Sequence, residues 1–487
     1  MRDSLGTLAI AAALLGAAPP AQAALTISGG ATKNVSCVSG VCTATAKTAV
    51  LNKNDLETML ASSNVQVVPG SVAMDIVTES GLTWVSGNTL TLDAYRSITI
   101  NQPVSVAGTG GLSITTDDGG SGGDYTFGPK GKVSFLSTSN SLTINGVAFT
   151  LLGGMSDVQA INANLTGNYA LANSYNAKHV TNWIPLGTDG MGNVLEGDGF
   201  TGTFEGLGNT ISNLTVNIGS HEYAGLFGLS TGATIRDVGI VGGTVTGGKF
   251  LGGLAGVASG TASGGGLIAR AYSTANVGGS SGDSNVVGGL VGISSGTISL
   301  SYATGTVTGD SQVGGLVGSN LGSGAIIGSF ATGTVTATVQ NNDEKNPGAG
   351  GLVGDNGETR AMIENSYAMG AIPGTSNFRG GLVGYSHTED VAIVNSYSTG
   401  LVGTGGSDVG GFLGCEVGGA LTDNYWDTQT GGESQGYGCN ANEPGITGLT
   451  TAQLQSGLPA GFDPTIWAEN PSINNGFPYL IANPPPQ

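Results

Sequence analysis

Serine residues between two glycines are the first candidates for chemistry in this sequence, because a Gly-x-Ser-x-Gly turn can present a nucleophilic serine. Such strings begin at Gly119, Gly228, Gly278, Gly292 and Gly432. A nucleophile of this kind needs a helix after the turn and a histidine as general base. The sequence has 3 histidines (His179, His221 and His387), and none of the strings precedes a helical pattern. We therefore attribute these strings to turns rich in glycine and serine, and we predict no catalytic residue.

Carboxylates in glycine-rich loops are the candidates for metal binding. The segment GGSGGDYTF at residues 119–127 resembles one calcium-binding nonapeptide, and a second acidic group lies between Trp183 and Phe204. Carboxylate and carbonyl oxygens are the ligands that Ca²⁺ prefers. Because calcium rolls need tandem copies of the nonapeptide, a solvated acidic turn is the simpler interpretation in both places. The candidate ligands for a structural calcium ion are Asp117, Asp118, Asp124, Asp189, Glu196 and Asp198. We predict no other cofactor.

The composition limits the partners that this chain can bind. Lys+Arg number 14 and Asp+Glu 33, and nucleic acids or anionic membranes are bound by clusters of basic residues, so we predict neither as a partner. Charged residues make up 10% and hydrophobic residues 39%, which is unlike a disordered chain. The 89 glycines, with 16 prolines and no three-residue period, exclude collagen and indicate many tight turns or close backbone contacts.

The N-terminus has the features of a secretory signal peptide. An apolar run from Leu5 to Ala18 is followed by Pro19-Pro20 and by the small-x-small sequence Ala21-Gln22-Ala23. We predict that residues 1–23 are removed and that the mature chain is secreted or displayed at the cell surface. The apolar run is shorter than the about 20 residues that cross a bilayer. No second run is long enough, so we predict no membrane span.

The cysteines lie near the two ends of the predicted mature chain. Export permits disulfides, and an even number of cysteines suits two local bridges. The alternative is a zinc site that uses all four thiolates, but the two ends of an elongated fold cannot meet. We therefore predict the disulfides Cys37–Cys42 and Cys415–Cys439.

A pentapeptide recurs through the second half of the chain in the forms AGLFG, GGLAG, GGLVG and GGFLG. Its copies begin at Ala224, Gly252, Gly288, Gly314, Gly350, Gly380 and Gly410. A second element follows several of them, from IARAYSTANV at residues 268–277 to IVNSYSTGLV at residues 393–402. Short stretches rich in Ile, Val, Thr and Tyr and cut by glycine form strands and turns. Because each unit is too small to bury its own face, we expect the units to stack and so build a common core.

Stacked repeats place equivalent residues above one another at about 4.8 Å. We predict an aliphatic ladder of Leu226, Leu254, Leu290, Leu316, Leu352 and Leu382. We also predict an aromatic ladder of Tyr272, Tyr302, Phe330, Tyr367 and Tyr397. The glycines beside each leucine are expected to allow corners, through either a positive φ or a close backbone contact.

The predicted architecture is all-β, a right-handed parallel β-helix (solenoid) with a short capping helix near the N-terminus. The predicted segments are residues 24–64 (cap with a disulfide and a helix), 65–215 (irregular early rungs of the same solenoid), 216–430 (regular repeats) and 431–487 (C-terminal cap and tail). The first helix is expected to begin after an N-cap at Asn54, and a second helix is expected at Thr451–Leu454. Either helix could cover a solenoid end, where strand edges are otherwise unpaired.

The pattern GGLVG followed by I-x-x-S-Y-x-x-G-x-V resembles the GLUG-motif repeat, which is named for its Gly-Leu-any-Gly core. The resemblance runs from about Thr201 to Pro444, and Phe412 departs from the leucine. GTFEGLGNTISNLTV at residues 202–216 and NYWDTQT at residues 424–430 are similar to the segments that flank such repeats. The N-terminal third is similar to the β-helical part of bacterial filamentous-haemagglutinin-like surface adhesins. The resemblance implies a bacterial, secreted or surface-displayed β-helix with an adhesin-like role, and it implies no particular ligand.

Two classes of enzyme contain similar repeats or a similar fold, but the sequence lacks the residues that their catalysis needs. GLUG repeats also occur in zinc metallopeptidases with an HExxH motif, but here Gly225 stands where the second histidine would follow His221-Glu222. Polysaccharide-cleaving β-helices need several carboxylates, often with Arg or Lys, on adjacent rungs of one face. The repeat strands carry almost none. Acidic residues instead precede the glycine motifs, where stacking would form a solvated acidic edge able to recruit cations: Asp283, Asp310, Asp343, Glu344 and Asp408.

We predict a secreted or cell-surface structural, adhesin-like protein without catalytic activity. Its expected partner is a ligand on a host or environmental surface, either a glycan or a protein, and we expect a monomer. The alternative function is a polysaccharide-binding or polysaccharide-cleaving β-helix.

Overall fold

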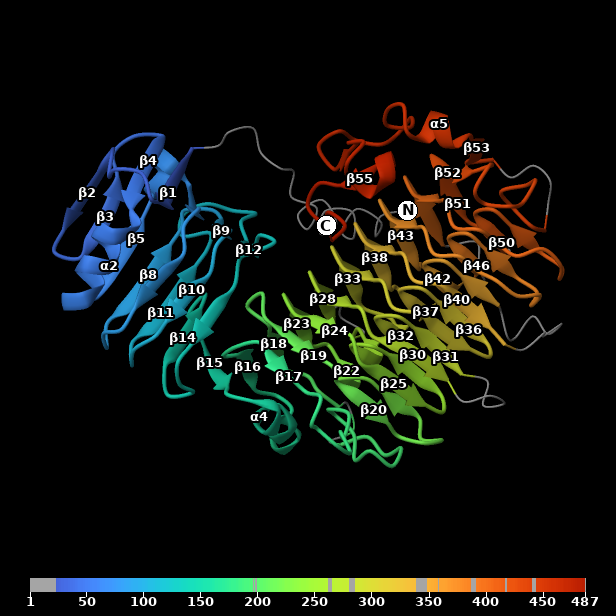
Figure 1. Ribbon diagram of the computed structural model, residues 1–487, viewed down its shortest axis with the longest axis horizontal. Coiled ribbons are helices and arrows are strands. Elements are labelled where there is room, and N and C mark those ends of the chain that lie inside the picture. The colour runs from blue at the N-terminus through green and yellow to red at the C-terminus, as the bar shows by residue number, and fades with distance from the viewer. Residues whose placement is uncertain are drawn as a thin grey trace.

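Short parallel strands form two stacks in this protein (Figure 1). The computed structural model describes residues 23–486, apart from residues 196, 198, 262–264, 280–284, 339–347, 358, 387–390, 417 and 440–443. The predicted signal peptide therefore lies almost wholly outside the described residues. Within them, no helix is both long enough and apolar enough to cross a membrane. The described chain is a parallel β-helix, as the repeat predicted.

The first stack contains residues 24–144 and has three sheets. One sheet has the order β12 (Tyr125–Phe127), β9 (Ile98–Ile100), β6 (Asp75–Thr78), β1 (Ala24–Ser28) and β4 (Thr48–Asn52). A second has the order β13 (Val133–Phe135), β10 (Val104–Val106) and β7 (Leu82–Trp84). The third contains β2 (Val35–Val38), β3 (Val41–Ala44), β5 (Val65–Val68), β8 (Thr89–Asp93), β11 (Gly111–Thr115) and β14 (Ser141–Ile144). Since β1 lies between β4 and β6, residues 24–64 belong to this stack, and the prediction of a separate cap there was wrong.

The strand direction reverses between the two stacks. Strand β15 (Val147–Leu152) pairs antiparallel with β14 through a two-residue turn, Asn145-Gly146, in which both φ values are positive. This is the turn chemistry that tight hairpins favour. From β15 onward the strands are again parallel to one another, so a single sheet of 16 strands passes from the first stack into the second. Of the residues 65–215 predicted as early rungs of the repeat solenoid, residues 147–215 therefore belong to the second stack, whereas for residues 65–144 the prediction was wrong.

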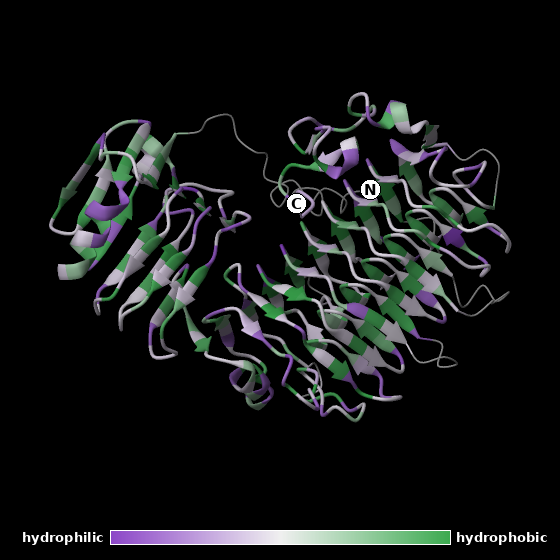
Figure 2. Ribbon diagram, in the orientation of Figure 1, coloured by the Kyte–Doolittle hydropathy of each residue, from purple (hydrophilic) through white to green (hydrophobic). Residues whose placement is uncertain are grey.

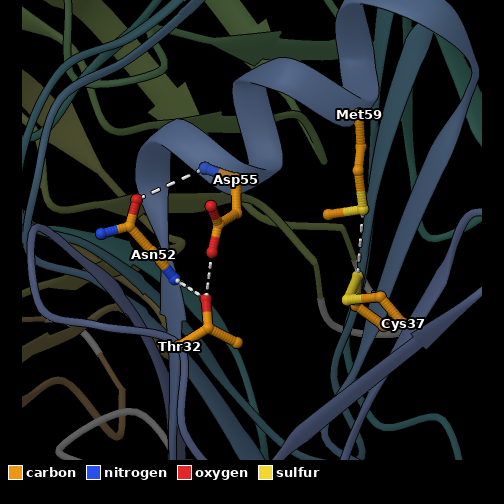
Figure 3. The surroundings of a disulfide bond; sticks show 6 residues. Thr32, Cys37, Asn52, Asp55 and Met59 are labelled. Atoms are coloured by element: carbon orange, nitrogen blue, oxygen red, sulfur yellow. Dashed lines mark hydrogen bonds between the residues drawn. A yellow bond between two sulfur atoms is a disulfide. The ribbon is translucent and has the colours of Figure 1, made fainter.

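Helix α2 (Lys53–Ser62) covers one sheet edge of the first stack. It packs against β7, the last strand of its sheet, and the Glu57 carboxylate accepts a hydrogen bond of 2.8 Å from the Thr83 N–H. The helix begins two residues earlier than predicted. Its N-cap is Asn52, whose side chain accepts from the Asn54 N–H at 2.8 Å and from the Asp55 N–H at 3.3 Å, the latter drawn in Figure 3. The prediction of Asn54 as the N-cap was wrong because Asn52, and not Asn54, has the extended backbone of a cap.

Replacing the true cap should destabilise the first stack. We expect Asn52→Ala to lower the free energy of unfolding by about 1–2 kcal/mol, because it removes acceptors for two orphan N–H groups. The side chain also donates to the carbonyls of Gly29 and Gly30. The matched control is Asn54→Ala, inside the helix, which should change stability by less than about 0.5 kcal/mol. Urea unfolding of both variants, followed by circular dichroism, measures the difference. An equal loss in both would contradict the assignment of the cap.

The second stack contains the glycine-rich repeats. Its long sheets begin at β15 and β16 (Asn168–Leu171), and continue through β18 (Thr203–Glu205), β23 (Thr234–Arg236) and β28 (Leu267–Ala269) to β51 (Ala420–Thr422). A 10-stranded sheet runs from β17 (Tyr175–Asn176) to β53 (Ile446–Leu449), and two 7-stranded sheets run from β21 (Tyr223–Ala224) to β49 (Val409–Gly410) and from β22 (Phe227–Thr231) to β50 (Leu413–Glu416). Figure 2 shows apolar residues alternating with paler ones along these strands.

The predicted aliphatic ladder lies at the centre of the second stack. Each of its leucines is fully buried, and Phe412 continues it without exposure. Backbone hydrogen bonds of 2.8 or 2.9 Å join successive members, from Leu254 N–H to the Leu290 carbonyl and onward to Phe412. None of the glycines in the GGLVG copies has a φ in the left-handed region. Close backbone contacts require glycine at these positions. Of the two causes expected for these glycines, a positive φ or a close backbone contact, the second is therefore confirmed.

The left-handed corner of each rung lies elsewhere, two residues after the aliphatic residue that begins the second element. Asp237, Arg270, Leu300, Gly328, Asn365, Asn395 and Asp423 occupy this position, each with a φ between 48 and 58°. Here the chain passes from the 16-stranded sheet into the 10-stranded sheet. Glycine, asparagine and aspartate tolerate this backbone, whereas Leu300 and Arg270 are strained there.

The serine that follows this corner forms a hydrogen-bonded ladder. The N–H groups of Ser301, Ser329 and Ser366 each donate to the serine hydroxyl of the next rung at 3.2 Å. Each of these hydroxyls donates back to the carbonyl two residues earlier, at 2.8 to 3.0 Å. The serines are buried, so the hydroxyl satisfies a corner N–H that has no strand partner. The Ser-Tyr pair of the repeat thus has a structural cause.

The predicted aromatic ladder is a continuous stack of parallel rings. Successive centroids from Tyr272 to Tyr397 are 4.8 to 5.1 Å apart, with interplanar angles of 5 to 7°. The C-terminal segment returns along this ladder and covers its later rungs (Figure 1). Trp467 lies 5.9 Å from the Tyr397 ring and donates to Asn365, and Asn483 donates to the carbonyls of Ser301 and Gly328. The predicted second helix is α5 (Thr451–Leu454), with a capping box between Thr450 and Gln453.

Candidate functional site

Two of the predicted calcium ligands, Asp117 and Asp189, are engaged within their own loops. Asp117 accepts a hydrogen bond from Gly123 N–H at 2.8 Å, and Asp118 lies beside the Asp93 carboxyl, whose pKa is raised by burial and further by Asp118. Asp189 accepts from Met191, from Asn193 N–H and from the Asn193 amide, and the pKa of its carboxyl is lowered by these hydrogen bonds, chiefly that to the amide. Glu196 and Asp198 lie outside the described residues.

Asp124 has a different environment, at the contact between the two stacks. It follows the loop before β12, and its carboxylate faces two arginines from the second stack. Arg236 Nη2 lies 2.9 Å from Oδ1, and Arg270 Nη1 lies 3.0 Å from Oδ2. The guanidinium groups of two arginines neutralise this carboxylate, which argues against its assignment as a calcium ligand.

Two more carboxyl groups complete this cluster. Asp237 accepts from Arg236 Nε at 2.8 Å and from Arg270 Nε at 2.7 Å. Glu205 Oε2 accepts a hydrogen bond of 2.6 Å from the Tyr125 hydroxyl and lies 3.6 Å from Arg236 Nε. The Arg236 guanidinium lies 4.0 Å above the Tyr125 ring, a cation–π contact. We call these residues the junction cluster: Asp124, Tyr125, Glu205, Arg236, Asp237 and Arg270.

Burial shifts the pKa values of the junction cluster. The side chains of Glu205 and Asp237 are 0% and 2% exposed, and burial raises the pKa of both carboxyl groups, although Arg236 opposes this. Burial and the Glu205 charge raise the pKa of Tyr125. Burial disfavours the charged Arg236 guanidinium, but the surrounding carboxylates outweigh it and raise the pKa of Arg236.

The ion pairs and hydrogen bonds of the junction cluster join the first stack to the second and stabilise their contact. Its Asp124 and Tyr125 come from the first stack and its other members from the second, separated in sequence by up to 146 residues. General acid–base catalysis requires a carboxyl group within hydrogen-bond reach of a substrate. Glu205 and Asp237 instead face only other members of the cluster and the Leu207 N–H. Asp124, 38% exposed, is the most accessible carboxylate.

Sequence reasoning missed Glu205, Arg236, Asp237 and Arg270, although a signal was present. The chain has 14 basic residues, and two of them occupy the same corner of adjacent rungs, in Ile235-Arg236-Asp237 and Ile268-Ala269-Arg270. Equivalent positions in later rungs are neutral or singly acidic. What the sequence did not indicate was the partner, because Asp124 and Tyr125 belong to the other stack.

Asp310, which was predicted to belong to a solvated acidic edge, is not exposed to solvent. This residue is buried, its N–H donates to Asn285 at 2.7 Å, and its carboxylate accepts from the Thr338 hydroxyl. The prediction of a solvated carboxylate there was wrong, because the neighbouring rungs supply its hydrogen bonds. Asp408 is partly exposed. Asp283, Asp343 and Glu344 lie outside the described residues.

The structure joins the cysteines in the two predicted pairs. Cys37 and Cys42 lie opposite each other on the hairpin β2–β3 at the end of the 16-stranded sheet, and Met59 Sδ lies 3.9 Å from Cys42 Sγ (Figure 3). Cys415 on β50 is bonded to Cys439, near Asp408. Each bridge fixes a segment at one end of the described chain. No cysteine is free.

Comparison with known proteins agrees with the repeat. The GLUG motif is matched over residues 309–336. These residues make one complete turn, from the end of β35 (Val307–Gly309) to β40 (Val335–Ala337). A 186-residue alignment with halomucin from Haloquadratum walsbyi is 31% identical and covers 32% of this chain but 2% of halomucin.

A solved structure, that of a candidate immunoglobulin A1 protease from Bacteroides ovatus, aligns with a TM-score of 0.46 and 19% identity, over 69% of this chain and 93% of that one. The family match covers one turn, and the same residue register extends through the neighbouring rungs. This chain therefore carries GLUG-motif repeats, folded as a parallel β-helix.

Proposed function

We propose that the protein is an exported, surface-displayed or secreted β-helix that acts as an adhesin-like binding protein without catalytic activity. The observation that supports this proposal most is the junction cluster. It contains the carboxylates and arginines that a polysaccharide-cleaving β-helix would need, yet each carboxylate is paired with an arginine, and Glu205 and Asp237 are also buried. They hold two stacks together.

Export is part of the same proposal. An apolar N-terminal segment and a small-x-small cleavage sequence support secretion, and the two disulfides are compatible with an oxidising compartment. The strongly acidic balance disfavours nucleic acid as the ligand. The remaining partners are uncharged or cationic surfaces outside the cell.

The test is incubation of purified residues 24–487 with a panel of acidic and neutral polysaccharides. We expect retention on at least one surface or matrix, and no new reducing ends or unsaturated products. Asp124→Asn is the matched variant, because Asp124 is the most exposed carboxylate of the junction cluster. Products formed by the natural chain and lost in Asp124→Asn would replace the adhesin-like function by a catalytic one.

A further inference from the structure

The last turn of the second stack is closed by a segment that leaves the sheets and returns to them. Strand β52 (Asn424–Asp427) precedes this segment and β53 follows it, and the two strands pair in parallel with each other (Figure 1). We call residues 431–439 the closing segment. Because the β52–β53 pair fixes the chain on both sides of it, the closing segment can open locally while the rest of the stack stays folded.

The closing segment covers the C-terminal end of the core. The N–H groups of Phe412 and Leu413 both donate to the Gly436 carbonyl at 2.9 Å, and the Gly438 N–H donates to the Leu413 carbonyl at 3.0 Å. Tyr437 is buried in the same apolar core as Phe412 and Leu413. These contacts continue the stack by one irregular turn, so loss of the closing segment would expose an apolar end and an unpaired strand edge.

The closing segment also brings a carboxylate to a buried cation. Arg379, on β45 (Arg379–Gly380), is fully buried, and its Nη2 donates to the Gly403 carbonyl at 2.6 Å. Burial lowers the pKa of Arg379, and the charge of Glu433 in the closing segment opposes this shift. A buried charge is costly unless an opposite charge offsets it. The closed position of the segment is therefore favoured by electrostatic attraction as well as by packing.

A disulfide ties the end of the closing segment to the stack. Cys439, its last residue, is bonded to Cys415 on β50. Cys439 is exposed and Cys415 is partly exposed, so a dissolved thiol can reach the bridge. Asp408 Oδ1 lies 3.1 Å from Cys439 Sγ. Because thiol–disulfide exchange spreads negative charge over three sulfur atoms, this carboxylate should slow the attack of a thiolate on the bridge.

The bridge at the other end of the chain has a different role. Cys37 and Cys42 lie on strands that backbone hydrogen bonds already join, and β3 pairs further with β5. The cysteines of this bridge are 5 residues apart, whereas Cys415 and Cys439 are 24 residues apart. A longer loop gains more conformational freedom when its bridge opens. Reduction of the first bridge should therefore release little, and reduction of the second should release the closing segment.

We propose that the Cys415–Cys439 disulfide is a redox-sensitive latch whose reduction releases the closing segment, and that the Asp408 carboxylate slows this reduction. The reductant is a dithiol outside the cell. One of its thiolates attacks Cys439 Sγ, the bond between the two cysteine sulfurs breaks, and Cys415 leaves with the electron pair and takes up a proton. The second thiol then displaces Cys439 from the mixed disulfide. In total, two electrons and two protons pass from the dithiol to the two cysteines.

The test is hydrogen–deuterium exchange of residues 24–487 with and without dithiothreitol. Reduction should make exchange about tenfold faster or more in peptides that contain residues 411–413 and 436–438, and should leave the ladder amides at Leu316 and Leu352 unchanged. The variant with both Cys415→Ser and Cys439→Ser should exchange fast without reductant. The matched control, with both Cys37→Ser and Cys42→Ser, should stay slow until dithiothreitol is added. Circular dichroism verifies that both variants fold.

A third variant keeps the bridge and tests its control. Asp408→Asn should be reduced about fivefold faster than the natural chain, and the salt dependence of the natural rate should disappear in this variant. A reduction rate equal to the natural one would overturn the role of Asp408. Slow exchange at residues 411–413 after reduction would overturn the latch itself. An equal increase in exchange along the whole second stack would also overturn it, because the bridge would then support the entire stack and not one segment.

Discussion

Arg236→Ala should lower the free energy of unfolding by about 3–5 kcal/mol, because it leaves the buried Glu205 carboxyl group without a cation and leaves Asp237 with only one of its two arginines. Arg236 contacts Asp124, Glu205 and Asp237, and its own side chain is 12% exposed. The alanine variant also loses the contact with the Tyr125 ring, on the other stack. We expect the two stacks to unfold in separate transitions in the variant, since the junction cluster links them.

The matched control is Lys249→Ala, which breaks an exposed ion pair. Lys249 Nζ lies 3.2 Å from Glu222, and the two side chains are 47% and 42% exposed. Pairs of this kind contribute at most about 1 kcal/mol. Urea unfolding followed by tryptophan fluorescence and circular dichroism compares the two variants. If Arg236→Ala costs no more than Lys249→Ala, the junction cluster does not lock the stacks.

The cost of Arg236→Ala should also depend on pH. The pKa values of Glu205 and Asp237 are raised above the ordinary 4.5 and 3.8 by burial. A raised carboxyl pKa gives stability that is fully present below the unfolded value and is lost as the pH rises through the folded value. Without Arg236 the folded pKa values rise further, so the loss should be larger at pH 7.5 than near pH 4. Glu205→Gln in the Arg236→Ala background should reduce this difference.

The regular part of the second stack could be predicted because its residues repeat with the strands. The leucine and aromatic ladders follow from the register of equivalent residues, which a parallel stack enforces. The helix at Thr451–Leu454 was visible because Thr450 and Gln453 form a local capping box. In each of these cases the information is local or repeats at a fixed period.

The features that escaped prediction depend on contacts between distant segments. The Asn145-Gly146 turn was a local signal for a hairpin, but the reversal between stacks was overlooked because all the flanking segments look alike as strands. Asp124 appeared to be a calcium ligand because its arginine partners lie 112 and 146 positions further along the chain. Asp310 appeared solvated because the Thr338 hydroxyl is supplied by another rung.

Gly314→Ala should be among the most destabilising small substitutions in the chain. An added Cβ would lie 1.8 Å from the Val317 carbonyl oxygen and 2.7 Å from the Gly354 nitrogen, both backbone atoms. Neither atom belongs to a flexible side chain, so the rung or its neighbour must shift. Overpacking of this severity costs about 3 kcal/mol or more. Because each rung depends on its neighbours, we expect the melting transition of the whole second stack to move.

Two other glycines separate this steric cost from backbone strain. At Gly219 an added Cβ meets nothing within 4 Å, but φ is +63°, so Gly219→Ala should cost about 1–2 kcal/mol from the left-handed backbone alone. At Gly278 there is neither a contact nor a positive φ, and Gly278→Ala should be neutral or slightly stabilising, by up to about 1 kcal/mol. Thermal unfolding of the three variants should give the order Gly314, Gly219, Gly278 from most to least destabilised.

If Gly219→Ala were more destabilising than Gly314→Ala, the glycines of the stack would be needed chiefly because they can adopt a positive φ. The expected order instead assigns the first glycine of the GGLVG motif to close backbone packing, both within its own rung and against the next rung. At Gly288, Gly314, Gly350 and Gly380, the added Cβ would lie 1.8 or 1.9 Å from the carbonyl oxygen three residues later. The motif repeats because this contact repeats, whereas the left-handed corner of each rung accepts asparagine, aspartate and even leucine. The recurring glycine therefore marks the corner where the chain passes most closely to itself within one turn, with a backbone nitrogen of the next turn also within 2.6 or 2.7 Å of the added Cβ.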